Sequence, residues 1–302
     1  MAYRMGSMPS ALAPANGIEI AYETYGDPAD TPLLLVMGLG AQLIAWPIDM
    51  VHAFVDRGFF VVRYDNRDVG LSTKCADVGA DFLTTFMQAA QGEPVEVSYR
   101  LTDMAADGMA LLDYLGIASA HVVGASMGGM IAQTMAIEYP TRVRSLTSIM
   151  STTGEPEVGM PTPEAVAVLL RPVATTRQGA IDASVEGSRM IGSPAFFDEA
   201  DIRRRAEAAY ERCYNPAGVA RQILAIAASG SRAEGLGQLN IPAVVIHGDL
   251  DPLVAPSGGQ RTAELIPGAR LIMIEGMGHD LPAAMIAQVV EAVTALASRV
   301  RA

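Results

Sequence analysis

The sequence predicts an α/β fold, in which a mostly parallel sheet is flanked by helices. Short apolar runs of strand length alternate with segments that have helical periodicity. These runs are too uniformly apolar to face water, which is typical of parallel strands buried on both faces. The alternation also stops for one long helical stretch and then resumes, which indicates an insertion within a single sheet rather than an appended domain.

The first half of the chain alternates strand and helix with little interruption. Residues 18–25 alternate apolar and polar side chains, as a half-exposed strand does, and the later runs are continuously apolar. Strands are expected at 18–25, 33–37, 59–64 and 121–125. We expect one helix to begin near Trp46, a second to end at Gly116, and a third to begin near Met127.

The second half resumes the same pattern after a gap. Strands are expected at 146–150, 242–248 and 269–276, followed by a closing helix over 285–300. Within the gap the strand pattern disappears, and prolines interrupt a helical stretch at Pro161, Pro163, Pro172, Pro194 and Pro216. The sequence therefore predicts a core domain over 1–152 and 238–302 and a helical cap, or lid, inserted at 153–237.

Length, composition and charge limit the classes of function. The chain has 302 residues, half of them apolar, which is enough for one large domain with a substantial buried core. Its net charge of −12 gives no electrostatic support for a phosphate-binding surface, so no nucleic-acid partner is expected. No stretch approaches the roughly 18 apolar residues of a membrane span, and residues 1–17 lack the apolar region of a secretory signal.

The two cysteines, Cys75 and Cys213, match no metal-ligand spacing and are interpreted as ordinary thiols of a reducing compartment. A structural disulfide between them is the alternative. The sequence therefore indicates a cytoplasmic protein without a metal site. It does not determine the oligomeric state, and a homo-oligomer is compatible with it.

Residues 124–128 form the pattern Gly-x-Ser-x-Gly at the predicted junction of a strand and a helix. Ser126 would lie on a sharp turn that needs small neighbours at Gly124 and Gly128 and that exposes its hydroxyl above the sheet. The following helix would direct the N–H of Met127 toward a developing oxyanion. The pattern therefore predicts a nucleophilic serine, and a close-packed turn with an incidental serine is the alternative.

A serine hydroxyl needs a base to take its proton, so a histidine is expected later in the chain. His279 follows a predicted strand, in the loop GMGHDLP before the last helix, at the edge of the sheet where strands deliver catalytic groups. His52 and His121 are interpreted as structural or exposed, and His247 as a packing residue or a second site residue. His279 is therefore the predicted base.

The base needs a carboxylate that orients its ring and stabilises its protonated form. Asp249 and Asp251 both follow the predicted strand at 242–248. Asp251 precedes Pro252, which favours an extended backbone that could project the carboxylate toward His279. Asp251 is therefore favoured. Asp249 is the alternative, although a turn closed by its own side chain explains that residue more simply.

The loop after the strand at 33–37 is expected to supply a second oxyanion donor. It reads MGLGAQLIAW, and its two glycines allow the backbone to turn N–H groups inward, with Leu39 as the predicted donor beside Met127. A plain glycine turn is the alternative. Trp46, at the end of this loop, is expected either to wall the pocket or to pack in the core.

Four stretches of the chain are informative when taken together: LLLVMGLGAQLIAWP at 33–47, VVRYDNRDVGLST at 61–73, HVVGASMGGMIAQ at 121–133 and GMGHDLP at 276–282. They resemble the serine esterases of the α/β-hydrolase fold, in particular the aclacinomycin methylesterases and related actinobacterial carboxylesterases. The resemblance implies an eight-stranded sheet, a helical cap over the site, no cofactor, and ester hydrolysis through an acyl-serine. It also implies that Asp65, Arg67 and Asp68 brace loops near the oxyanion hole.

The predicted function is cleavage of a small-molecule carboxylic ester by Ser126, Asp251 and His279, which follow the chain order of nucleophile, acid and histidine known from this fold. Cofactor-free perhydrolases, lactonases and carbon–carbon bond hydrolases use the same triad. A non-catalytic small-molecule-binding protein can also have this fold. The predicted cap carries no motif that identifies the substrate.

Overall fold

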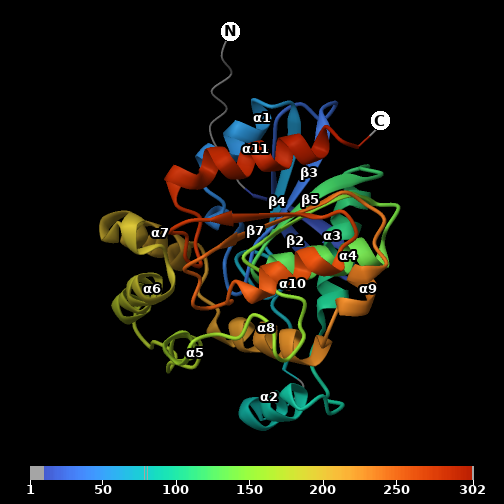
Figure 1. Cartoon of the computed structure of the whole chain (residues 1–302). Coiled ribbons are helices and arrows are strands. Elements are labelled where there is room, and N and C mark those ends of the chain that lie inside the picture. Colours follow the sequence, from blue (N-terminus) through green and yellow to red (C-terminus); the bar gives the residue numbers. More distant parts are fainter. Residues whose placement is uncertain (1–9, 78, 80, 301–302) are drawn as a thin grey trace.

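The computed structural model describes residues 10–77, 79 and 81–300, which form a single sheet with helices on both faces (Figure 1). The strands are β1 (Ala11–Ala15), β2 (Ile18–Tyr25), β3 (Thr31–Val36), β4 (Phe59–Tyr64), β5 (Ala120–Ala125), β6 (Val143–Ile149), β7 (Ala243–Gly248) and β8 (Arg270–Ile274). Their order across the sheet is β1-β2-β4-β3-β5-β6-β7-β8. The predicted α/β fold with eight strands is confirmed.

The helices include α1 (Ile48–Val55), α2 (Phe82–Ala90), α3 (Leu101–Tyr114), α4 (Met127–Glu138), α5 (Pro163–Leu169), α6 (Arg177–Ile191), α7 (Glu199–Arg212), α8 (Pro216–Ser229), α9 (Ala233–Gly237), α10 (Ser257–Leu265) and α11 (Ile286–Ala297). Single 3-10 turns lie at Leu43–Ala45, Pro194–Phe196 and Ala283–Met285. The predicted helices near Trp46, before Gly116, after Ser126 and at the end of the chain correspond to α1, α3, α4 and α11.

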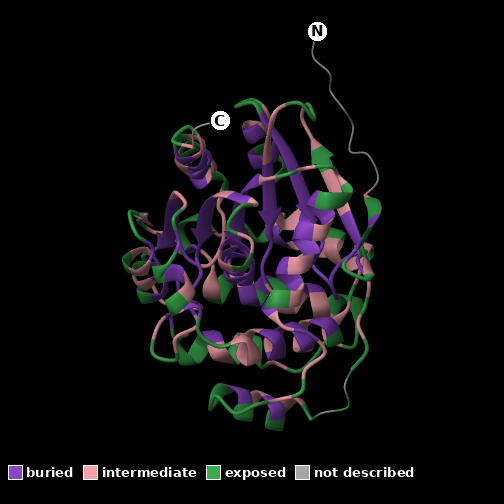
Figure 2. Ribbon diagram, turned by 90° about the vertical axis from the view of Figure 1, so that its right-hand side faces the viewer, coloured by how far each residue is buried: buried purple, intermediate pink, exposed green. Residues whose placement is uncertain are grey.

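Strand direction explains the apolar character of the central strands. The strands from β4 to β8 in the sheet order run parallel to one another, whereas at one edge β2 pairs antiparallel with β4 and β1 pairs antiparallel with β2. Every residue of β4, β5 and β7 is buried, and Figure 2 shows the central strands in the colour of buried residues. Continuous apolar runs are therefore required because helices cover both faces.

Alternate residues of each strand enter two separate apolar clusters. Leu34 and Val36 of β3 pack with side chains of α3 and α4 on one face. Leu33 and Leu35 pack with side chains of α1 and α11 on the other. This alternation fixes the register of the sheet. Because β5, β6, β7 and β8 pair in parallel, the carboxyl ends of β5, β7 and β8 lie at one edge and their following loops can meet there.

A helical insertion occupies the segment between β6 and β7 and contains α5 to α9. In Figure 1, α5 to α8 lie beside and below the sheet, whereas α9 packs near α4 and α10. Pro163 and Pro216 lie in the first turns of α5 and α8, where a missing N–H costs nothing, so these prolines begin helices instead of interrupting them.

The division into a core over 1–152 and 238–302 and a cap over 153–237 stays a prediction. Residues 1–9 and 301–302 of that predicted core, and residues 78 and 80, lie outside the described residues. Residues 1–9 belong to the segment 1–17 for which the sequence predicts no secretory signal.

Three elements were not predicted from the sequence. β1 reads ALAPA and pairs only with β2 at the sheet edge, where a proline is tolerated. α2 packs against α8 instead of the sheet. α10 contains Gly258 and Gly259, which weaken helical propensity, yet a side chain at Gly259 would overlap the ring of His247. Tertiary packing therefore overrides the local signal at α10.

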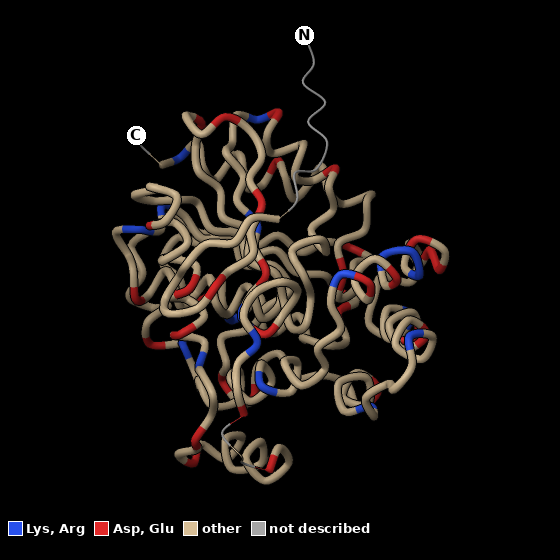
Figure 3. The backbone as a smooth tube through the Cα atoms, turned by 180° about the vertical axis from the view of Figure 1, so that it is seen from behind, with Lys and Arg blue, Asp and Glu red and all other residues tan. Residues whose placement is uncertain are grey.

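The surface carries both signs of charge. Figure 3 shows acidic and basic residues close together on the helices of the insertion, and in α7 several of them form ion pairs within one or two turns. Among the described residues, no helix combines the length and apolar character needed to cross a membrane.

Buried ion pairs connect the insertion to the loop that follows β4. Asp68 accepts two hydrogen bonds of 2.8 Å from Arg221 of α8 and one of 2.6 Å from the Tyr99 hydroxyl. Asp65 accepts a bond of 2.6 Å from Arg212 of α7 and one of 2.7 Å from the N–H of Leu43. Burial favours a raised pKa for Asp68, but the bonds from Arg221, Tyr99 and Cys75 N–H outweigh it and lower the pKa.

We expect Asp68→Ala to lower the free energy of unfolding by about 3–5 kcal/mol, because it leaves a largely buried Arg221 without its main partner. Urea denaturation measures this change. The control is Asp113→Ala, whose side chain is 63% exposed in its pair with Arg142, and which should cost less than about 1 kcal/mol. Equal effects of the two substitutions would contradict the role assigned to Asp68.

Candidate active site

Ser126 occupies a strained turn between β5 and α4. Its φ of 57° and ψ of −123° are unusual for a residue with a side chain. Hydrogen bonds hold the turn, since Ser126 N–H donates to Ile149 O at 2.9 Å and Ser126 O accepts from Gly129 N–H at 2.8 Å. Such strain persists only where the surroundings enforce it, and it is typical of functional sites.

The two glycines around Ser126 are explained by close approach of the backbone. A Cβ atom at Gly124 would overlap the carbonyl oxygen of Gly128, and one at Gly128 would overlap the carbonyl oxygen of Val36. Neither glycine has a positive φ. The small residues are therefore needed because β5, α4 and the end of β3 cross without room for a side chain.

His279 bridges the two other residues of the predicted triad. Its Nε2 lies 2.9 Å from Ser126 Oγ, and its Nδ1 lies 2.7 Å from Asp251 Oδ2. The side chains of Asp251 and His279 are 0% and 7% exposed. An ionised carboxylate can only accept, so it favours the tautomer with a proton on Nδ1 and leaves Nε2 to accept the serine proton.

Asp251 is held as an anion. Its Oδ1 accepts the N–H groups of Leu253 and Val254, both at 2.9 Å. Burial alone would raise the pKa of Asp251, but the charge on His279, hydrogen bonds from His247 and His279, and the Val254 N–H lower it to about 2. The carboxylate therefore stays negative at neutral pH and can stabilise a protonated imidazole.

Asp249 has a different contact. Its Oδ1 accepts the N–H of Gly276 at 2.7 Å, which ties the loop after β7 to the start of the histidine loop, residues 276–282. The bond to His279 Nδ1 comes from Asp251. Of the two carboxylates that the sequence left open, the structure therefore brings Asp251 to the imidazole.

The other histidines do not contact Ser126. His52 is exposed on α1, edge-on to the Tyr25 ring. His121 is buried, with Nδ1 at 2.7 Å from Ser145 Oγ, and burial, followed by the charge of Arg144, lowers its pKa to about 4. His247 is fully buried, and its Nε2 lies 2.8 Å from Val254 O and 3.5 Å from Asp251 Oδ2.

The loop after β3 passes directly against the serine. A Cβ atom on Gly38 would lie 3.0 Å from Ser126 Cβ. In this loop Gly40 N–H donates to Gln222 Oε1 at 2.8 Å, and Ala41 N–H donates to Gly38 O at 3.2 Å. The hydrogen bonds among the described residues do not use the N–H groups of Leu39 and Met127, so both remain available to a bound group.

Contacts between the insertion and this loop were not predicted from the sequence. Gln222 of α8 is fully buried, and besides accepting from Gly40 its Nε2 donates to Arg67 O at 2.9 Å. Gln42 Nε2 donates to Ala209 O at 2.7 Å and to Cys213 O at 2.8 Å. These partners are far apart in the chain, and a glutamine in an amphipathic helix gives no local signal of such a role.

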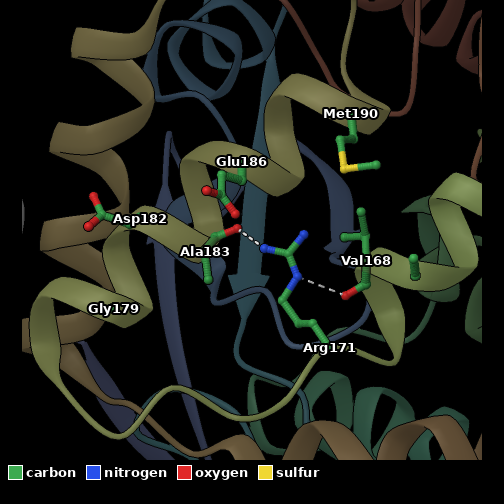
Figure 4. A pocket seen from close by; sticks show the side chains of 8 residues that line it. Val168, Arg171, Gly179, Asp182, Ala183, Glu186 and Met190 are labelled. Atoms are coloured by element: carbon green, nitrogen blue, oxygen red, sulfur yellow. Dashed lines mark hydrogen bonds between the residues drawn. The ribbon is translucent and has the colours of Figure 1, made fainter.

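Trp46 is fully buried within the apolar cluster of α1 and α11 instead of facing an open pocket. A cavity of about 440 Å³ lies between α5 and α6, away from the triad, and Figure 4 shows Arg171, Asp182 and Met190 among the residues that line it. Within the part of the chain that the structure describes, no three His, Cys, Asp or Glu side chains are grouped to hold a metal ion.

The chain is similar in sequence and in fold to known hydrolases. The chain matches a family model described as the alpha/beta hydrolase fold over residues 31–282. It is 32% identical over 300 residues to rhodomycin D methylesterase DnrP of Streptomyces peucetius, covering 92% of this chain and 94% of that protein. It is 27% identical over 271 residues to 3-oxoadipate enol-lactonase 2 of Acinetobacter baylyi, covering 86% of each. The solved structure of esterase RhEst1 from Rhodococcus sp. has the same fold, with a TM-score of 0.73 at 20% identity, covering 97% of this chain and 100% of that one.

The lowered pKa of Asp251 predicts a pH-dependent stability. Because the folded pKa of about 2 lies below the ordinary 3.8, the carboxylate stabilises the fold at neutral pH, and this contribution is lost as the pH falls from about 5 toward 2. The contribution is about 2 kcal/mol. Urea denaturation of the wild type and of Asp251→Asn should therefore give a difference in unfolding free energy that is smaller at pH 3 than at pH 7. A constant difference would contradict the shift.

Proposed function

The chain belongs to the alpha/beta hydrolase fold family, as its motifs predict, and on this premise we propose that it hydrolyses carboxylic esters with Ser126 as the nucleophile. The observation that carries the proposal is the hydrogen-bonded chain from Ser126 through His279 to Asp251. The similarity to a methylesterase over 92% of the chain supports the same reaction type.

In the first half of the reaction, Ser126 Oγ attacks the ester carbonyl carbon while His279 Nε2 accepts its proton. The N–H groups of Leu39 and Met127 donate to the oxyanion of the tetrahedral intermediate. The carbon–oxygen bond to the alcohol then breaks, and His279 gives its proton to the departing alcohol. The product of this half is an acyl group esterified to Ser126.

In the second half, water replaces the alcohol. His279 accepts a proton from the water as it attacks the acyl carbon, and the same two N–H groups stabilise the second oxyanion. The bond to Ser126 Oγ breaks, and His279 returns the proton to the serine. Asp251 remains ionised throughout, because its pKa of about 2 lies far below neutral pH, and it stabilises the imidazolium in both halves.

The substrate class that we propose is a methyl ester of a small-molecule carboxylic acid, by analogy with rhodomycin D methylesterase. A lactone is the second candidate, because 3-oxoadipate enol-lactonase 2 is 27% identical over most of the chain. A series of methyl, ethyl and longer alkyl esters and simple lactones, compared by kcat/KM, distinguishes the two. If the protein binds these compounds but neither hydrolyses them nor reacts with a fluorophosphonate, it is a small-molecule-binding protein instead of an enzyme.

Several further assignments belong to this proposal. Residues 1–152 and 238–302 form the catalytic core, and 153–237 form the cap over the substrate. The partner is a small molecule, and the oligomeric state, including a homo-oligomer, is open to direct measurement. A cytoplasmic location is supported by Cys75 and Cys213, which are both free thiols.

Removing the nucleophile tests the proposal most simply. We expect Ser126→Ala to lower kcat for a p-nitrophenyl ester by about 10⁶-fold, because no other group can form the acyl intermediate. Circular dichroism of the variant controls for loss of fold. Turnover at the wild-type rate by a folded Ser126→Ala protein would refute the assignment.

The two carboxylates of the loop after β7 form a matched pair for a second test. Asp251→Asn should lower kcat by about 10⁴-fold, because an amide favours the wrong tautomer of His279. Asp249→Asn should change kcat far less, since Asp249 accepts only the N–H of Gly276 among the hydrogen bonds described. Steady-state kinetics at neutral pH compare them, and a larger loss in Asp249→Asn would reverse the assignment.

A further inference from the structure

The segment that ends α6 is bonded to the loop that carries His279. His279 N–H donates to Ile191 O at 2.7 Å, and Gly278 N–H donates to Ser193 Oγ at 2.8 Å. Asp280 Oδ1 accepts both the N–H of Ser193 at 3.0 Å and its hydroxyl at 2.5 Å. Two residues of the insertion, Ile191 and Ser193, therefore hold three consecutive residues of the histidine loop, 278–280.

The contact between residues 191–193 and residues 278–280, which we call the joint, is closely packed. A Cβ atom on Gly278 would lie 2.5 Å from both the carbonyl carbon and the carbonyl oxygen of Gly192. A Cβ atom on Gly192 would lie 3.0 Å from Asp280 Oδ2. Ser193 is 2% exposed, so water cannot readily replace the hydroxyl in its two bonds. The two backbones are therefore in direct contact, and the contact leaves little room for either segment to move independently.

The core holds the histidine loop at a different point. Asp249 accepts the N–H of Gly276, and Leu250 N–H donates to Met277 O at 3.0 Å. From Gly278 to Asp280, the backbone hydrogen bonds described go to the insertion. The core therefore fixes the beginning of the loop, whereas the insertion fixes the residue whose imidazole must reach Ser126.

We propose that Ser193 and Asp280 are positioning residues for His279, so that the helical insertion sets the geometry of the general base as well as enclosing substrate. The inference rests on the proposed function, because it concerns the same histidine. Proton transfer requires Nε2 to stay within hydrogen-bond distance of Ser126 Oγ, and a displacement of about 1 Å can lower a rate about 10²-fold. Loss of the Ser193 hydroxyl removes two of the bonds that prevent such a displacement.

The test measures kcat and KM for a p-nitrophenyl ester in Ser193→Ala, Asp280→Ala and the double variant. Each single substitution should lower kcat about 10-fold to 100-fold with KM changed less than about threefold. The double variant should be little worse than the more severe single variant, because both remove one shared contact. Fluorophosphonate labelling of Ser126 should slow in parallel, since it too needs the base.

Ser229→Ala is the matched control. Ser229 is also a serine of the insertion that bonds across to the core, since its Oγ accepts Leu101 N–H at 2.9 Å and donates to Ala225 O at 2.6 Å. Its removal should leave kcat within about twofold of wild type. The proton NMR spectrum supplies a second readout, because the far-downfield resonance of His279 Nδ1–H should broaden or shift in Ser193→Ala and stay unchanged in Ser229→Ala.

Wild-type kcat in both single variants, or a rise in KM with kcat unchanged, would overturn the inference. So would equal losses in Ser193→Ala and Ser229→Ala. Asp280→Ala breaks the same joint from its partly exposed side, which keeps the test available if Ser193→Ala does not fold. Failure of the proposed function is recognised separately, because Ser126→Ala would then still hydrolyse the ester.

Discussion

The close crossing of β5, α4 and the end of β3 at Ser126 is the constraint on which the site depends. Gly124 and Gly128 permit this crossing, and it forces Ser126 into a strained backbone conformation that exposes the hydroxyl. The same crossing brings the loop after β3 against the serine, and the N–H groups of Leu39 and Met127 take part in none of the hydrogen bonds among the described residues. The positions of the proposed nucleophile and of the proposed oxyanion donors are thus consequences of one packing arrangement.

Buried carboxylates determine how the loops around this crossing are held. Asp65 and Asp68 follow β4 and bind arginines of α7 and α8, whereas Asp251 follows β7 and binds His279. Each would be costly to bury alone, and each is compensated by several donors. The insertion contributes the arginines, Gln222 and Ser193, so it contacts both the loop after β3 and the histidine loop. The insertion is therefore structurally continuous with the site.

The sequence predicted the parts of this arrangement that depend on local rules. Ser126 follows from small residues at a strand-to-helix turn, and His279 and Asp251 follow from the position of loops after parallel strands. Gln222 and Ser193 could not be found in this way, because their partners are more than eighty residues distant and neither lies in a recognisable pattern. The position of Trp46 could not be predicted either. An isolated aromatic residue in a loop can line a pocket or pack in the core, and only the structure shows that Trp46 is buried in the core.

The central claim is that one serine carries the acyl group. Labelling the wild-type protein with a fluorophosphonate and mapping the modified peptide by mass spectrometry tests it directly. We expect one stoichiometric adduct on Ser126, formed in step with loss of esterase activity and greatly slowed in His279→Ala. Ester hydrolysis that persists without an adduct, or an adduct on a different residue that tracks the loss of activity, would contradict it.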